Sequence, residues 1–150
     1  MARRGNRDKT ITIYCHWKRD DGLVKPVRRL LKGSWKRRGI SAALQTGNIL
    51  KEPSSIRIFC ADNEDITYIP PHEWYKLPEE ELDKYWTADI ELSAKPMIMQ
   101  FESDFELDFD EESKIIKAEN DYIRKTPGAM RIVQCDDNRE PSGSHIRLQA

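Results

Sequence analysis

Residues 10–17 read Thr-Ile-Thr-Ile-Tyr-Cys-His-Trp, and this stretch decides the class of fold. Its apolar and polar side chains alternate, which is the period of an extended chain with one buried face. One face carries Ile11, Ile13, Cys15 and Trp17, and the other carries Thr10, Thr12, Tyr14 and His16. We therefore predict a half-buried strand here, followed by a turn at Asp20-Asp21-Gly22.

Further short strands are predicted from similar patterns along the rest of the chain. They cover residues 40–46, 55–60, 66–69, 86–92, 97–101, 101–109, 129–135 and 145–148. Residues 27–36 are ambiguous between strand and helix, and Gly33 and Trp35 within them favour a strand. The segment 86–92 alternates most regularly, and residues 97–101 are expected to pair back to it. Residues 136–143 are expected to form a polar loop.

Helical structure is predicted at two places. Pro78, followed by three glutamates, favours a short helical turn within residues 77–85. Residues 110–125 carry apolar side chains at helical spacing, with acidic residues at the start and basic residues at the end, as the helix dipole favours. Glu119 places a charge midway along this apolar stripe.

The order of these elements argues against a doubly wound sheet. We predict a mainly β (α+β) protein, a small antiparallel β-barrel or sandwich with one packed α-helix near residues 110–125. With 150 residues, the chain is long enough for one domain with a sizeable core. Residues 1–9 are expected to form a flexible basic arm, and residues 10–150 a single domain.

The composition excludes several classes of protein. No stretch approaches the roughly 18 consecutive apolar residues of a membrane span, and no apolar stretch follows the basic N-terminus as in a signal peptide. Cys15, Cys60 and Cys135 lie far apart and fit reduced thiols in a chain that is synthesised in the cytosol.

The net charge of -1 conceals a strong asymmetry along the chain. Residues 1–40 contain 13 lysines and arginines against 3 acidic residues, and residues 41–150 contain 12 basic and 23 acidic residues. The basic third could face nucleic acid, with Trp17 and Trp35 beside it for stacking, and binding would then be sensitive to salt. Oppositely charged regions of neighbouring copies could instead attract each other. The third interpretation is a basic arm with solvated loops and no further role.

No motif for catalysis or for a cofactor is present. The chain lacks GxGxxG, P-loop, GxSxG and HExxH sequences. The three histidines are dispersed, so no metal site is predicted. Cys15-His16, or Cys135 with His145, has no orienting third group and no oxyanion site nearby in the sequence. We therefore interpret the chain as a non-enzymatic protein without a cofactor.

The acidic stretch 102–112 has three interpretations. Divalent-cation binding would need glycine and oxygen ligands at turn spacing, which are missing here. An edge strand kept soluble by its charges is the commoner arrangement. The third interpretation is an acidic ladder that docks onto a basic partner. Along a strand, the carboxylates on one face would be Glu102, Asp104, Glu106 and Asp108.

A series of segments in this chain resembles one family of proteins in the same order. The segments are Thr10-Ile11-Thr12-Ile13-Tyr14, Leu31-Lys32-Gly33-Ser34-Trp35, Ser55-Ile56-Arg57-Ile58-Phe59, Tyr68-Ile69-Pro70-Pro71-His72-Glu73-Trp74, Trp86-Thr87, Val133 to Arg139 and His145-Ile146-Arg147-Leu148. Together they resemble the minor capsid or head-closure (head–tail connector, stopper-like) proteins of tailed bacteriophages of Gram-positive bacteria. The chain departs from that pattern at Ala88-Asp89-Ile90, where a glycine–aspartate step is usual, and at Ile146, where an aromatic residue is usual.

The resemblance implies a structural protein of the virion that acts by assembly. It implies a homo-oligomeric ring, for example a dodecamer, between the portal or adaptor and the tail proteins, made in the host cytoplasm and located at the head–tail interface of the virion. Non-specific contact with packaged DNA is compatible with it, and a membrane is not involved. The expected mechanism is the combination of many weak contacts by ring symmetry.

The charge asymmetry suggests which residues would join neighbouring copies. The candidate subunit-interface residues are Arg28, Arg29, Lys36, Arg37, Arg38, Glu102, Asp104, Glu106, Asp108 and Arg139. Asp137-Asn138-Arg139 is interpreted first as a turn stabilised by its own side chains, with a contact role for Arg139 second. The alternative function is a phage-encoded interaction protein or inhibitor whose acidic strand mimics the phosphates of DNA.

Overall fold

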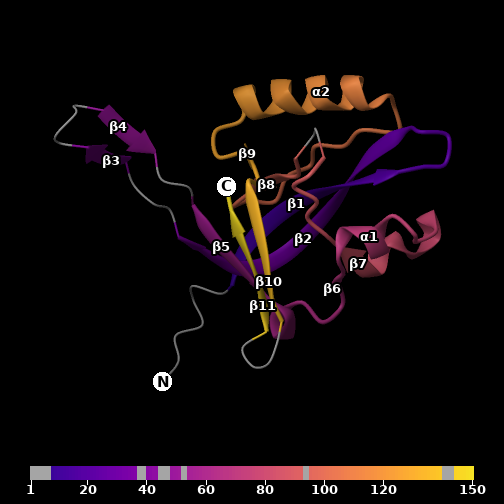
Figure 1. Ribbon diagram of the computed structural model, residues 1–150, viewed down its shortest axis with the longest axis horizontal. Helices are drawn as coiled ribbons and strands as arrows, with labels where there is room; N and C mark the ends of the chain where they lie inside the picture. Colours follow the sequence, from indigo (N-terminus) through magenta and orange to yellow (C-terminus); the bar gives the residue numbers. More distant parts are fainter. Residues whose placement is uncertain (1–7, 37–39, 44–47, 52–53, 93–94, 140–143) are drawn as a thin grey trace.

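The structure is a computed structural model that describes residues 8–36, 40–43, 48–51, 54–92, 95–139 and 144–150. An antiparallel seven-stranded sheet forms its centre, in the order β10-β11-β5-β2-β1-β8-β9 (Figure 1). The strands are β1 (Lys9–Lys18), β2 (Val24–Lys36), β5 (Ser55–Phe59), β8 (Met97–Met99), β9 (Met130–Arg131), β10 (Gln134–Asn138) and β11 (His145–Gln149). The sheet curls into an incomplete barrel, and the predicted mainly β class is confirmed.

Shorter elements surround this sheet. They are β3 (Ile40–Ala43), β4 (Asn48–Lys51), the 3-10 helix η1 (Cys60–Asp62), β6 (Thr67–Tyr68), α1 (Pro71–Trp74), the 3-10 helix η2 (Glu79–Lys84), β7 (Tyr85–Trp86) and α2 (Glu112–Lys125). The packed helix near residues 110–125 and the helical turn within 77–85 are confirmed, whereas α1 was not predicted. No helix in the described part of the chain is long and apolar enough to span a membrane.

The hairpin of β1 and β2 is the longest pairing in the sheet. Every residue of β1 pairs with β2, from Lys9 opposite Gly33 to Lys18 opposite Val24. Gly33 has a steric role, because a Cβ atom there would lie 2.4 Å from the carbonyl oxygen of Arg57 in β5. Only glycine therefore lets β5 pair with β2 at this register.

The apolar face of β1 lies in the main core. Ile11, Ile13 and Cys15 are fully buried, and Trp17 is nearly so. The segment between β5 and β8 covers this face, since Trp74 of α1 and Trp86 of β7 belong to the same cluster of buried side chains. In Figure 1, α1 and β7 lie below the β1–β2 hairpin and α2 lies above it.

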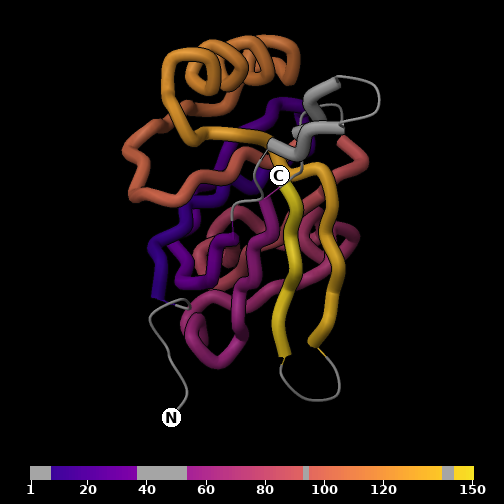
Figure 2. The backbone as a smooth tube through the Cα atoms, turned by 90° about the vertical axis from the view of Figure 1, so that its left-hand side faces the viewer, coloured from indigo at the N-terminus to yellow at the C-terminus, as the bar shows by residue number. Residues whose placement is uncertain are grey.

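The polar face of β1 is also buried, so the prediction of a half-buried strand is wrong. Thr12 and Tyr14 are 0% exposed and His16 is 3% exposed. Tyr14 packs with Met97 and Met99 of β8 in a second cluster, against which the segment following β8 and the helix α2 also pack. Figure 2 shows α2 crossing above the sheet, while β10 and β11 form a hairpin at one edge.

The regular alternation at residues 86–92 does not correspond to a strand, which corrects the prediction made there. Only Tyr85 and Trp86 form a strand, and they pair in parallel with β6. The chain then crosses the apolar face of the sheet, where Ala88 is buried. Residues 97–101 accordingly do not pair with 86–92, because β8 pairs with β1 and β9 instead. Trp86, Thr87 and Ala88 are buried one after another, so burial here does not follow the alternation of the sequence.

Two further strand predictions need correction. Residues 101–109 are extended but contain no strand. The strand expected at 129–135 is two strands, β9 and β10, and β10 continues to Asn138, so the loop expected at 136–143 starts later. β3 confirms the first part of the strand predicted at 40–46, and the rest of that segment lies outside the described residues, as does most of the predicted arm 1–9.

Candidate functional site

The acidic segment runs along the β1–β2 hairpin as an extended chain. The exposed carboxylates are Glu102, Asp104, Glu106 and Asp108, as their alternation predicted. Side chains of the hairpin hold the backbone, since Tyr14 Oη donates to the carbonyl oxygen of Phe105 at 2.6 Å and Arg28 Nη1 to that of Ser103 at 2.6 Å. The alternation in exposure therefore depends on hydrogen bonds from side chains to the backbone.

A groove of about 480 Å³ lies between β2 and this acidic segment. Its lining is Lys25, Pro26, Val27, Arg28, Arg29, Glu106, Leu107 and Asp108. The structure thus brings acidic and basic candidate interface residues together within one copy of the chain. Each copy presents both signs of charge side by side, and pairing between neighbouring copies stays a prediction.

Arg29 is engaged within its own chain. Its Nε donates to the carbonyl oxygen of Tyr85 at 2.8 Å, and its Nη2 donates to that of Leu82. Burial lowers the pKa of the Arg29 guanidinium below its ordinary value. These bonds attach the η2–β7 region to β2, so Arg29 has a structural role whether or not it also meets a partner.

The other basic candidates lie elsewhere. Lys36 is exposed at the end of β2, and Arg37 and Arg38 lie outside the described residues. Arg139 follows β10, where its Nε donates to Asp137 Oδ1 at 2.8 Å and its guanidinium lies 5.1 Å from the centre of the Tyr68 ring. The Arg139 side chain lowers the pKa of the Asp137 carboxyl. Asp137 Oδ1 also accepts the Arg139 backbone N–H at 3.2 Å, as the first interpretation expected, but Asp137 and Asn138 belong to β10, so the predicted turn is wrong.

A buried polar network joins β1, α2 and β9, and the sequence did not predict it. His16 Nε2 lies 2.9 and 2.8 Å from the two carboxylate oxygens of Glu119, whose side chain is fully buried. Arg131 Nη1 donates to Glu119 Oε1 at 3.0 Å, and Arg131 Nη2 to Asn120 Oδ1 at 2.9 Å. The network ties the helix to both strands through one carboxylate.

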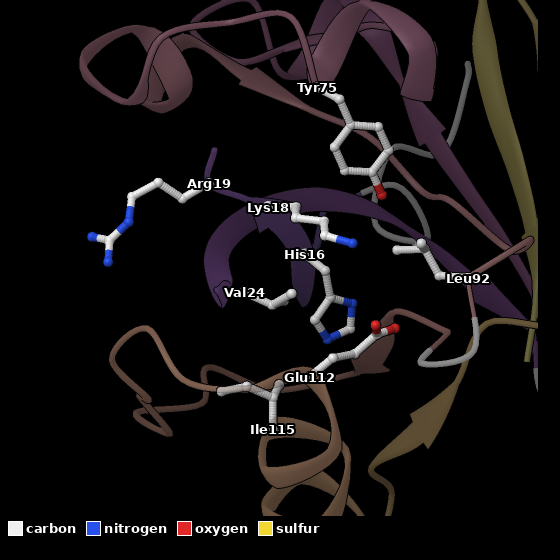
Figure 3. Close-up of a pocket in the computed structure, with 8 residues that line it drawn as sticks. All are labelled: His16, Lys18, Arg19, Val24, Tyr75, Leu92, Glu112 and Ile115. Atoms are coloured by element: carbon white, nitrogen blue, oxygen red, sulfur yellow. The ribbon is translucent and has the colours of Figure 1, made fainter. Parts of the chain in front are cut away.

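A pocket of about 290 Å³ opens beside this network (Figure 3). It is lined by His16, Lys18, Arg19, Val24, Tyr75, Leu92, Glu112 and Ile115. In Figure 3, the His16 ring points into the space between β1 and the first turn of α2, with Tyr75 and Leu92 on its other side. His16 Nδ1 is buried, and no group in the described part of the chain hydrogen-bonds to it.

The chemistry available here is recognition by hydrogen bonds. The described residues contain no group of three side chains that could hold a metal ion. The neighbouring Cys15 thiol donates to the carbonyl oxygen of Thr87 at 3.1 Å, and burial raises its pKa to about 11. A thiol that is protonated at neutral pH is a poor nucleophile. The pocket therefore presents one edge of the fixed His16 imidazole ring among mainly apolar side chains.

One feature of the sequence could have indicated this network. Glu119 interrupts the apolar stripe of the predicted helix, and a charged residue at such a position is rarely buried without a partner. His16 lies 103 residues away from it, on the strand face expected to be exposed. Local sequence patterns cannot show that two residues so far apart in the chain contact each other.

Compared with protein families, with curated proteins and with solved structures, the chain matches none.

Proposed function

We propose that this chain is a structural subunit of a tailed-phage virion, a head-completion (head–tail connector) protein that assembles into a ring between the portal or adaptor and the tail. The observation that carries the proposal is the ordered series of segments, from Thr10-Ile11-Thr12 to His145-Ile146-Arg147, that resembles head-closure proteins. The protein would act by packing, without an enzymatic reaction or a cofactor.

The positions of these segments in the fold support the proposal. The first, second, third and last of them lie in β1, β2, β5 and β11, which are consecutive neighbours in the central sheet. Residues 68–74 and 86–87 include β6, α1 and β7, whose side chains Tyr68, Trp74 and Trp86 pack on that sheet. The resemblance therefore covers one connected folding core, which is what a shared fold would require.

The structure also refines the candidate interface. Glu102, Asp104 and Glu106 are exposed and held on a fixed backbone, so they are available to a neighbouring copy. Arg28 and Arg29 already donate to carbonyl oxygens of their own chain, which leaves Lys36 as the more available basic residue. A ring in which each copy offers one charged surface to the next uses such contacts many times.

A nonsense mutation in the gene of the phage that encodes this chain tests the proposal. We expect electron micrographs of infected cells to show DNA-filled heads that leak or lack tails, and a plasmid copy of the gene to restore complete particles. Normal infectious particles without the protein would contradict the proposal. Portal, major capsid and tail-tube genes beside this gene are the expected neighbourhood.

One observation favours the alternative, an inhibitor that mimics DNA. Four exposed carboxylates alternate along an extended backbone, so neighbouring ones are about 7 Å apart along the chain. Lys25, Arg28 and Arg29 line the same groove and reduce the negative electrostatic potential of these carboxylates. Charge reversal at Glu102, Asp104, Glu106 and Asp108 separates the two functions. The inhibitor would lose its effect on a nuclease while virions stay normal, whereas the connector would lose assembly.

A further inference from the structure

His16 presents one ring nitrogen to the pocket in a defined chemical form. A carboxylate only accepts hydrogen bonds, so the contact with both oxygens of Glu119 places the proton on Nε2. A ring with its single proton on Nε2 presents the lone pair of Nδ1 as an acceptor. The side chain is 2% exposed, and Nδ1 has no partner among the described residues. A buried acceptor without a donor is unfavourable, which indicates a group that enters the pocket and donates.

The walls of the pocket are mainly apolar. Val24, Leu92 and Ile115 supply aliphatic side chains, and Tyr75 supplies one side of the space. The Tyr75 hydroxyl donates to Asp89 Oδ2 at 2.8 Å, so its own proton is already used. A volume of about 290 Å³ is near the lower end of ligand pockets, which run from roughly 300 to 1,000 Å³. One ring or a fused pair of rings matches this size.

The charged residues of the pocket leave it close to neutral. Arg19 is engaged outside it, since Nε and Nη2 donate to Asp21 Oδ2 at 3.0 and 2.7 Å. Lys18 and Glu112 then contribute one charge of each sign to the lining. A charged ligand would lose its hydration without a net opposite charge in return. The geometry thus favours an uncharged ligand, and the Lys18 ammonium can lie against the face of a ring.

We propose that this pocket binds an uncharged aromatic group with a single hydrogen-bond donor, such as an indole or a phenol, which donates to His16 Nδ1. The apolar walls would hold the ring, and the imidazole would select molecules that carry the N–H or O–H. Glu119 and Arg131 act as positioning residues, because they fix the tautomer and orientation of the imidazole. The site is independent of the proposed role in the virion.

Titration of the purified full chain with indole and with 1-methylindole tests the proposal. The two probes have nearly the same apolar body, and only indole has a donor. We expect saturable shifts of the Val24, Leu92 and Ile115 methyl signals in NMR spectra, and a dissociation constant at least about tenfold lower for indole. Equal affinities for the two probes would overturn the proposal, because His16 Nδ1 would then select no donor. No saturable binding at all would also overturn it and leave a pocket that holds only water.

Two variants check the location. His16→Gln keeps an N–H directed toward Glu119 but removes the ring acceptor, so the preference for indole over 1-methylindole should disappear. Leu92→Trp fills the pocket from a partly exposed position and leaves the buried network intact, so both probes should stop binding even if His16→Gln fails to fold. Unchanged binding of indole to folded Leu92→Trp would show that the probe binds elsewhere, against the proposal.

Titration with a third probe identifies whether the aromatic group comes from a partner chain or from a free small molecule. N-acetyltryptophanamide carries the same indole on a peptide backbone. Tighter binding of this probe than of indole would assign the pocket to a tryptophan side chain of a partner chain. Binding of indole alone would assign it to a free small molecule, because the pocket then lacks room for a backbone. Either result supports the aromatic donor as the ligand class.

Discussion

From Ile11 to Trp17 both faces of β1 are buried, but they are stabilised differently. Ile11 and Ile13 on one face are in an apolar core. On the other face Thr12, Tyr14 and His16 each have a polar partner in the segments that cover them. Thr12 Oγ1 donates to the carbonyl oxygen of Phe101 at 2.5 Å, Tyr14 Oη lies 2.9 Å from Ser103 Oγ, and His16 contacts Glu119. Alternating polarity thus shows which side chains share a face, and the covering segment decides whether water reaches it.

This difference determines how each face responds to substitution. Truncation on the apolar face removes contacts and leaves a cavity. Truncation on the polar face leaves a buried partner without its hydrogen bond, which costs the desolvation of that partner. The largest loss of stability is therefore expected when a charged partner of a buried polar side chain on this face is removed.

Glu119→Ala is expected to cause the largest loss of stability. It leaves Arg131 and His16 Nε2 without their acceptor, and breaking a buried ion pair by removing one partner costs about 3–5 kcal/mol. The free energy of unfolding, measured by urea denaturation, should fall by this amount. Glu106→Ala, at an exposed carboxylate, is the control and should change it by less than about 0.5 kcal/mol. Similar losses for both variants would contradict the role of the network.

Ionisation of the buried Cys15 thiol on the apolar face should lower the free energy of unfolding at alkaline pH. Burial raises the pKa of this thiol from its ordinary 9.0 to about 11. A group whose pKa is raised by folding contributes its full stability below the pKa of the unfolded chain, near pH 9, and that contribution is lost as pH rises through 11. The difference between the two pKa values corresponds to about 3 kcal/mol. Unfolding measured from pH 8 to pH 11 should show this decline.

Cys15→Ala is the control for the alkaline decline. Tyr14 and Cys135, whose pKa values burial raises to about 12 and about 11, remain in both proteins. The variant should therefore lose stability less steeply than the natural chain between pH 9 and 11. Identical slopes would mean that the thiol is not shielded from water in the folded state.

The sequence predicted β1 and the helix near residues 110–125 because each has a long, regular period that local geometry enforces. It failed at residues 86–92, where Trp86, Thr87 and Ala88 are buried in succession and the strand ends at Trp86. In such a segment, alternating polarity predicts neither the burial of the side chains nor the hydrogen-bond partner of the backbone. The candidate surface followed from charge alone, whereas the contact of His16 with Glu119 depends on a helix that packs over a distant strand.

Tyr14→Phe is expected to lower the free energy of unfolding by less than Glu119→Ala or the ionisation of Cys15. It removes the hydroxyl that donates to the carbonyl oxygen of Phe105 and keeps the ring, so we expect a loss of about 1–2 kcal/mol. Backbone amides of residues 103–105 should also exchange their hydrogens faster, because the hydroxyl anchors this segment to β1. Ile13→Val on the opposite face, expected to cost about 0.5–1.5 kcal/mol, should leave that exchange unchanged. Equal exchange in both variants would contradict the anchoring role.

The smallest effect on stability is expected for the exposed carboxylates Glu106 and Asp108, which follow the anchored residues 103–105 in the chain. The double variant Glu106→Gln, Asp108→Asn keeps the shape of both side chains and removes two charges from the groove shared with Arg28. Exposed ion pairs contribute little, so urea denaturation should give a change of less than about 0.5 kcal/mol. Association between copies, measured by sedimentation at low and high salt, should weaken if these carboxylates meet a neighbouring copy. A clear loss of stability in the isolated chain would instead mean that the charges act within the fold, as those of the buried network do.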